Sequence, residues 1–106
     1  MKYYLAIDIG ASSGRHILGS MQDGKMQLEE IYRFENGVKK INDEFCWDIE
    51  NLFEQIKMGI KKCKEIGKIP TSIAIDTWAV DFVLLDENDQ ILGNTVSYRA
   101  SVLSAL

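Results

Sequence analysis

One helical pattern, over residues 49–66, separates two groups of strand-like segments in this chain. Its apolar residues recur at steps of three and four, which gathers them on one face of a helix. They are Ile49, Leu52, Phe53, Ile56, Ile60, Cys63 and Ile66. Asp48 suits the N-cap, and Gly67 can supply the left-handed residue that ends the helix. A helix between two groups of strands predicts a crossover connection in the fold.

Three strand-like segments precede the helix. Residues 2–9 are β-branched, aromatic and almost continuously apolar, which is typical of a central strand buried on both faces. Residues 15–21 and 25–34 follow, and the Asp23-Gly24 pair between them favours a tight hairpin turn. We therefore predict that the first third of the chain is an antiparallel meander.

Further strand-like segments follow the helix. Residues 72–76 have the pattern of a buried strand, and residues 82–86 and 91–96 flank a polar turn, which predicts a second hairpin. No strand is predicted in the polar segment 35–44. The order βββαβββ lets the strand after the helix lie beside the first one, which predicts a mixed sheet and a single α/β domain.

Composition excludes several classes of protein. A chain of 106 residues with 46% hydrophobic residues and one proline can build a core without disulfides, and it does not resemble a disordered segment. Its net charge of -4 argues against binding to nucleic acid or to anionic membranes. Two cysteines, Cys46 and Cys63, and one histidine do not make a zinc site or a disulfide framework. The histidine, His16, is predicted to be an ordinary sheet residue.

The sequence pattern also predicts neither a signal peptide nor a membrane span. Asp8 interrupts the N-terminal apolar run too early for a signal peptide, and no later segment approaches the roughly 20 apolar residues of a membrane span. We therefore expect a cytoplasmic protein whose two thiols are reduced.

The segment AIDIGASSGR carries the first group of residues suited to chemistry. Asp8 ends the first strand, and the small-residue turn 10–14 follows it. Two glycines let the backbone approach a ligand, and backbone N–H groups with two serine hydroxyls can cradle a phosphate beside the positive charge of Arg15. A neighbouring carboxylate suits Mg²⁺, which takes one or two carboxylates together with phosphate oxygens and water. The pattern lacks GK[ST] and is not GxGxxG, so a phosphate site and a purely structural hairpin turn both remain open.

A second group lies in the segment IDTWAVDFVLL. Asp76 and Asp81 stand on either side of Trp78, whose indole offers a broad apolar face and one N–H donor. Such a pairing is typical of polyol and sugar sites. Two alternatives remain open: a core tryptophan between two turn-capping aspartates, and a carboxylate pair for glycoside hydrolysis, whose separation the sequence does not determine.

Together, AIDIGASSGR, IDTWAVDFVLLD and VSYR resemble the N-terminal part of the L-rhamnulose kinase (rhamnulokinase) branch of the FGGY carbohydrate kinases, in the actin-like ATPase superfamily. The segments IYRFENG and WDIENLF also fit this branch, so the resemblance extends to Arg99. It implies two ribonuclease-H-like domains with ATP and sugar between them. Residues 1–106 would then be the incomplete first part of the N-terminal domain, and the second domain would be absent. From the residues alone, Tyr98-Arg99 either reaches a ligand or caps a surface edge.

The resemblance also implies a reaction and its cofactors. The γ-phosphoryl group of ATP would pass to the 1-hydroxyl of L-rhamnulose or a related ketose, with Asp8 holding Mg²⁺ through water. The ATP-phosphate loop would consist of Ala11, Ser12, Ser13, Gly14 and Arg15. Ala79 stands at a sugar-contacting glycine of the family, between the substrate residues Trp78 and Asp81, and its methyl group bears on sugar choice.

Two expectations follow for the isolated chain. The catalytic base of the family, an aspartate, would lie beyond residue 106, so we expect the chain alone to be inactive. An alternative is a non-catalytic nucleotide- or sugar-binding module of the same superfamily. In both cases missing sheet partners would favour association with the absent C-terminal domain or with a second copy.

Overall fold

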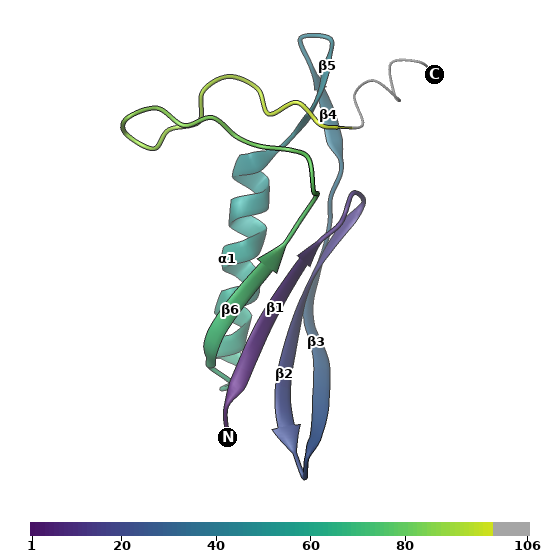
Figure 1. The fold of residues 1–106 in the computed structure, drawn as a ribbon, viewed down its shortest axis with the longest axis vertical. Helices are drawn as coiled ribbons and strands as arrows, with labels where there is room; N and C mark the ends of the chain where they lie inside the picture. Colours follow the sequence, from purple (N-terminus) through teal and green to yellow (C-terminus); the bar gives the residue numbers. More distant parts are fainter. Residues whose placement is uncertain (99–106) are drawn as a thin grey trace.

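The computed structural model describes residues 1–98, which form six strands and one helix (Figure 1). In chain order they are β1 (Tyr3–Ile9), β2 (Ser13–Gln22), β3 (Lys25–Glu35), β4 (Val38–Ile41), β5 (Glu44–Trp47), α1 (Ile49–Glu65) and β6 (Pro70–Asp76). Four strands form a sheet in the order β3-β2-β1-β6, in which β1 is antiparallel to β2 and parallel to β6. The predicted meander, crossover helix and mixed sheet are therefore confirmed.

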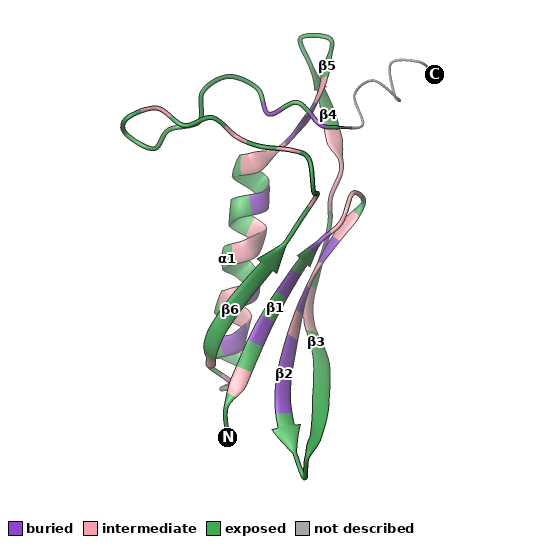
Figure 2. Ribbon diagram, in the orientation of Figure 1, coloured by how far each residue is buried: buried purple, intermediate pink, exposed green. Residues whose placement is uncertain are grey.

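The core lies between α1 and one face of the four-stranded sheet (Figure 2). Along β1, Leu5, Ile7 and Ile9 are buried, whereas the alternate residues Ala6 and Asp8 are exposed. The expectation that this strand is buried on both faces is therefore wrong for the described residues. Helix α1 covers one face of the sheet, so the side chains that alternate to the other face meet solvent.

Helix α1 begins and ends within one residue of the predicted bounds. Asp48 is the N-cap, and its Oδ1 accepts a hydrogen bond from the backbone N–H of Asn51 at 3.1 Å. Lys39 Nζ lies 2.6 Å from the other oxygen of this carboxylate. The hydrogen bond from Lys39, followed by that from Asn51, holds the pKa of Asp48 below its usual value. Gly67 follows the helix with a φ of 73°, the left-handed conformation predicted for it.

His16 connects the sheet to the helix. It is a fully buried residue of β2, and its Nε2 lies 3.1 Å from the carbonyl oxygen of Ile56 in α1. The ring occupies the space left by Gly59, because a Cβ at that glycine would overlap the imidazole. Burial lowers the pKa of His16, so the imidazole is neutral at pH 7. The prediction of a structural sheet residue is confirmed.

A hairpin occupies part of the segment 35–44, where no strand was predicted. Strands β4 and β5 pair antiparallel, and Asn42 and Asp43 between them have φ values of 50° and 67°. Left-handed conformations at both central residues are those of a two-residue hairpin turn. The strands have only four residues each, and their sequences, VKKI and EFCW, give no clear alternation. This short length is why the pattern was missed.

The second predicted hairpin, residues 82–86 with 91–96, is reduced to an isolated bridge, and neither arm is a strand. The later arm instead turns toward β5. Val96 forms a bridge with Cys46, and Thr95 accepts a backbone hydrogen bond from Trp47 at 2.9 Å. These bonds to β5 take the place of the expected ladder.

Candidate functional site

The turn between β1 and β2 is held by its own backbone and by Asn36 at the end of β3. Gly10 N–H donates to the carbonyl of Ser13 at 2.9 Å, which closes the turn. Asn36 donates twice, from its backbone N–H to the Ser12 carbonyl at 2.9 Å and from Nδ2 to the Gly10 carbonyl at 2.8 Å. Sequence reasoning missed Asn36, although its place beside a glycine at the end of a strand was a possible signal. The carbonyl groups of Gly10, Ser12 and Ser13 are thus hydrogen-bonded within the protein.

Two backbone N–H groups of this turn, unlike these carbonyl groups, have no hydrogen-bond partner among the described residues. Within residues 1–98, no acceptor is hydrogen-bonded to the backbone N–H of Ala11 or Ser12. Ser12 is exposed, and Ala11 and Ser13 are half-buried. A short turn with satisfied carbonyls and free N–H groups can bind an anion.

Gly14 is explained by packing rather than by access to a ligand. It is buried, and a Cβ at this position would overlap the ring of Phe34 in β3. The core therefore requires a glycine here, and the approach of a ligand to its backbone stays a prediction. Its indirect effect is to let β2 and β3 lie close together directly after the turn.

Asp8 and Arg15 face each other across β1 and β2. They are register partners, and Arg15 Nη2 lies 2.9 Å from Asp8 Oδ2. Their side chains are 50% and 42% exposed, so Asp8 is not the buried carboxylate that the strand pattern suggested. Ion pairs this exposed contribute little to stability, about 0–1 kcal/mol. A bound anion can therefore replace Asp8 as the partner of Arg15 with little loss of stability. The Asp8 carboxylate is then free to bind another group.

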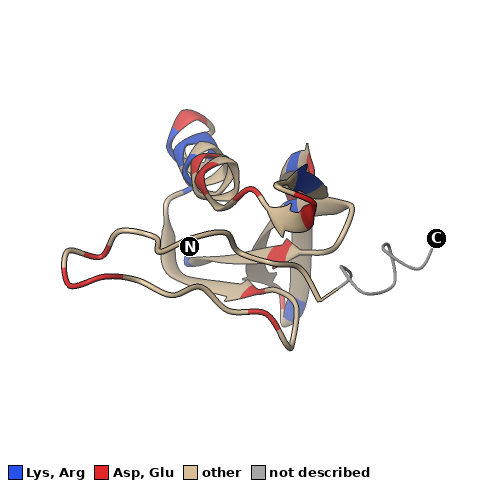
Figure 3. Cartoon of the chain, turned by 90° about the horizontal axis from the view of Figure 1, so that it is seen from above, with Lys and Arg blue, Asp and Glu red and all other residues tan. Residues whose placement is uncertain are grey.

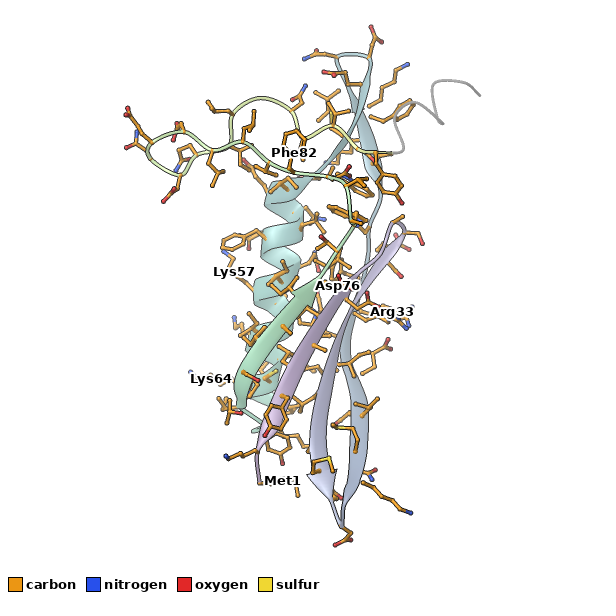
Figure 4. All side chains as sticks on the ribbon, in the orientation of Figure 1. Met1, Arg33, Lys57, Lys64, Asp76 and Phe82 are labelled. Carbon is orange, nitrogen blue, oxygen red and sulfur yellow. The ribbon has the colours of Figure 1, made fainter. Side chains whose placement is uncertain are left out.

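A second carboxylate lies beside the first. In the parallel pair of β1 and β6, Asp76 is the register partner of Asp8, and Figure 4 labels it at the end of β6. The carboxyl ends of parallel strands meet at one edge of a sheet, so both side chains stand at the edge that carries the turn 10–14 (Figure 1). Within residues 1–98 no group of three or more acidic, His or Cys side chains could hold a metal. Two carboxylates alone fit an ion such as Mg²⁺ that keeps water and phosphate ligands.

Trp78 follows two residues after Asp76 and stacks on Trp47 of β5. Their ring centroids are 3.8 Å apart, with an angle of 6° between the planes. Trp78 is half-buried, and its buried Nε1 has no hydrogen-bond partner among the described residues. Sequence reasoning missed Trp47, although the adjoining Asp48 N-cap had marked the position where the helix begins.

Asp81 is held by the same tryptophan. Its Oδ2 accepts hydrogen bonds from the indole Nε1 of Trp47 and from the backbone N–H of Tyr98, the latter at 3.1 Å. Asp81 also borders a cavity of about 210 Å³. Ala79 is exposed between the two held residues. Of the pair Tyr98-Arg99, Arg99 lies outside the described residues.

The charge around these residues is acidic. The segment 77–98 contains four carboxylates and neither lysine nor arginine, and it extends away from the sheet as a long loop (Figure 3). Arg15 supplies positive charge at the sheet edge instead. Within residues 1–98, no helix is both long and apolar enough to cross a membrane.

Three comparisons bear on this arrangement. The model for the N-terminal domain of the FGGY family of carbohydrate kinases matches residues 3–102. The rhamnulokinase of Halalkalibacterium halodurans is 60% identical over 93% of this chain and 21% of its own length. The rhamnulokinase of Bacillus subtilis is 47% identical over 91% of this chain and 20% of its own length. The chain thus spans about one fifth of the length of these relatives.

Solved structures show the same fold. The xylulose kinase from Lactobacillus acidophilus has a TM-score of 0.75 at 14% identity, over 99% of this chain and 21% of its own. The gluconate kinase of the same organism also gives 0.75 at 14% identity, over 98% and 21%. These similarities confirm the predicted fold class, a mixed α/β sheet shared with the first part of these two structures.

Proposed function

Because the chain belongs to the FGGY family of carbohydrate kinases, we propose that it is the first part of a longer kinase that phosphorylates L-rhamnulose. The observation that carries the proposal is the meeting of turn 10–14, Asp8 and Asp76 at one sheet edge, with Trp78 directly after it. The reaction transfers the γ-phosphoryl group of ATP to the 1-hydroxyl oxygen of the ketose. It yields ADP and a ketose 1-phosphate, and the hydroxyl proton passes to a base outside residues 1–106.

The turn 10–14 and Arg15 bind the phosphates in this proposal. The free N–H groups of Ala11 and Ser12 and the serine hydroxyls donate hydrogen bonds to the phosphate oxygens, and Arg15 leaves Asp8 to neutralise the phosphate charge. Gly14 keeps the turn close to β3 through its contact with Phe34. These residues act by position and charge, which is how phosphoryl transfer is accelerated in general.

Asp8, with Asp76 beside it, would hold Mg²⁺ when ATP is bound. The ion would supply positive charge that offsets the negative charge of the phosphate groups. Arg15 is the residue that must move first, since it occupies one oxygen of Asp8 in the present structure.

Trp78, Ala79 and Asp81 contact the sugar. The indole offers an apolar face to one side of the ketose, and the carboxylate accepts a hydrogen bond from a hydroxyl. High identity to the rhamnulokinases supports L-rhamnulose over the sugars of the structural neighbours, whose identity is only 14%. We place the enzyme in the cytoplasm, where ATP and reduced thiols are found.

The test is an ADP-release assay on the full-length protein with ATP and Mg²⁺. L-Rhamnulose, D-xylulose and gluconate are supplied in parallel, and we expect the highest kcat/KM with L-rhamnulose. Xylulose or gluconate turnover above that of L-rhamnulose would correct the substrate. Absence of sugar-dependent ADP with any substrate would contradict the kinase and favour the alternative, a non-catalytic binding module. Residues 1–106 alone are expected to release no ADP, because they lack the base.

A further inference from the structure

Trp47 makes three separate contacts with the segment 77–98. Its ring stacks on Trp78, its indole N–H donates to Asp81 Oδ2, and its backbone N–H donates to the Thr95 carbonyl at 2.9 Å. The side chain is only 2% exposed and belongs to the main core cluster. Trp47 therefore links two of the residues proposed to contact the sugar to the rigid part of the fold.

The other contacts of the segment 77–98 with β5 lie near its end, where Val96 forms a bridge with Cys46 and the Ser97 N–H donates to the Phe45 carbonyl at 2.9 Å. The segment contains no strand or helix, only isolated bridges. Its apolar side chains Val80, Phe82 and Leu84 are 69%, 73% and 60% exposed, and Figure 4 shows Phe82 on the extended loop. Because these side chains do not pack into a core of their own, the orientation of the segment depends on its contacts with β5.

The contacts from Trp47 leave one oxygen of Asp81 available. Both hydrogen bonds to Asp81 end on Oδ2, and within residues 1–98 none ends on Oδ1. Trp78 stacks on Trp47, packs against the main core cluster and remains partly exposed. A carboxylate with one oxygen held and one free, beside a partly exposed indole, suits a ligand with both hydroxyl and C–H surfaces.

We propose that Trp47 is a positioning residue of the sugar subsite, which sets the plane of Trp78 and directs the free oxygen of Asp81 to a sugar hydroxyl. This inference rests on the proposed function. It assigns Trp47 no contact with the substrate. Its role is to hold two residues that do make contact, so its loss weakens sugar binding and leaves the ATP turn, on the other side of β1, unchanged.

The test compares Trp47→Phe and Trp47→Leu in the full-length enzyme. Phe keeps an aromatic ring for stacking but loses the N–H donor, whereas Leu loses both. We expect the KM for L-rhamnulose to rise roughly threefold to tenfold in Trp47→Phe, the scale of the net contribution of one typical hydrogen bond. The rise is larger in Trp47→Leu, and the KM for ATP stays constant in both.

Leu52→Ala is the matched control, because Leu52 belongs to the same core cluster, is 5% exposed and makes no hydrogen bond to the segment 77–98. It should lower the melting temperature without changing the sugar KM. Circular dichroism reports on the stacked pair directly, because two stacked indole rings give an exciton signal. Trp47→Phe and Trp78→Phe should each remove this signal.

The outcomes separate the two proposals. An active enzyme in which Trp47→Phe leaves the sugar KM unchanged, or raises both KM values equally, overturns the positioning role and leaves the kinase intact. A wild-type protein with no sugar-dependent ADP release overturns the proposed function, and the positioning role with it. A selective rise in the sugar KM supports both.

Discussion

The two regions proposed to bind ligands are held in different ways. The turn 10–14 is closed by its own backbone and by Asn36, and strands β2 and β3 lie directly behind it. The segment 77–98 has no regular structure, and two of its key residues depend on Trp47. The first region therefore has support from its own backbone as well as from the distant Asn36, whereas two residues of the second depend on the single distant Trp47. Substitutions outside each region should accordingly change phosphate binding less than sugar binding.

The largest effect should come from removing the carboxylate next to the turn. Asp8→Asn in the full-length kinase should lower kcat on the order of 100-fold or more, the scale for losing one charge that stabilises the transition state. The ADP-release assay measures this. Asp23→Asn is the control, since Asp23 lies in the β2–β3 turn with a φ of 53°, a conformation that Asn tolerates. Near-normal kcat in Asp8→Asn would remove Asp8 from the proposed site.

Packing behind the turn gives the next largest effect. Gly14→Ala should destabilise the protein by about 1–3 kcal/mol, because the new methyl group overlaps the Phe34 ring and the core must shift. Urea unfolding measures the loss. Gly37→Ala is the matched control, as a Cβ there meets nothing within 4 Å and its φ is not left-handed. Equal stability of the two variants would show that Phe34 can move aside for the methyl group, so the packing behind the turn is less rigid than the structure indicates.

The same contrast explains which parts of the structure could be predicted. Helix α1 and the sheet order follow from patterns that are local and long enough to read, and the Asp48 cap and Gly67 end follow from single-residue chemistry. The hairpin β4–β5 has strands too short to show a period. The environment of Asp81 could not be predicted, because the partner that holds it is 34 positions away. Non-local contacts leave no periodic trace in a single sequence.

The surroundings of Asp8 also could not be predicted from the sequence. The apolar run around it correctly indicates a central strand, but the hydrophobic pattern alone does not show which faces of the sheet are covered. Only the register with β2 brings Arg15 opposite the carboxylate, and only the register with β6 adds Asp76. The motif thus identified the turn, and the topology supplied the neighbours.

A smaller, pH-dependent effect should appear at His16, which supports β2 from the face opposite to Arg15. Its Nδ1 is buried and has no hydrogen-bond partner within residues 1–98, and Tyr32 and Phe34 of β3 and Gly59 of α1 surround the ring. Because its folded-state pKa is lowered from 6.5, the unfolded chain binds the proton more readily. The stabilising effect of the neutral ring is complete above about pH 6.5 and is lost as the pH falls toward the folded-state pKa.

Urea unfolding at a series of pH values between about 7.5 and 5 measures this dependence. His16→Gln keeps a side-chain N–H for the Ile56 carbonyl but does not titrate, so its stability should change less over this range. Parallel pH profiles for the two proteins would contradict the assignment. Asp48, whose pKa is lowered from 3.8, contributes stability that is complete above that pH and is lost only at more acidic pH. Its pH dependence therefore lies below the measured range, and the two effects are separable.

The smallest effect is expected at Ala79, within the less supported region. In a closed apolar pocket one methyl group changes discrimination by about tenfold or more. Ala79 is exposed and belongs to a segment without regular structure, so its surroundings can adjust to the loss of a methyl group. Ala79→Gly should therefore change the KM for L-rhamnulose less than about tenfold and leave the KM for ATP constant. A larger change would mean that the sugar, or chain beyond the described residues, encloses Ala79 tightly. The segment held by Trp47 would then be as rigid in the bound enzyme as the turn 10–14, and the difference between the two regions would be a property of the free state alone.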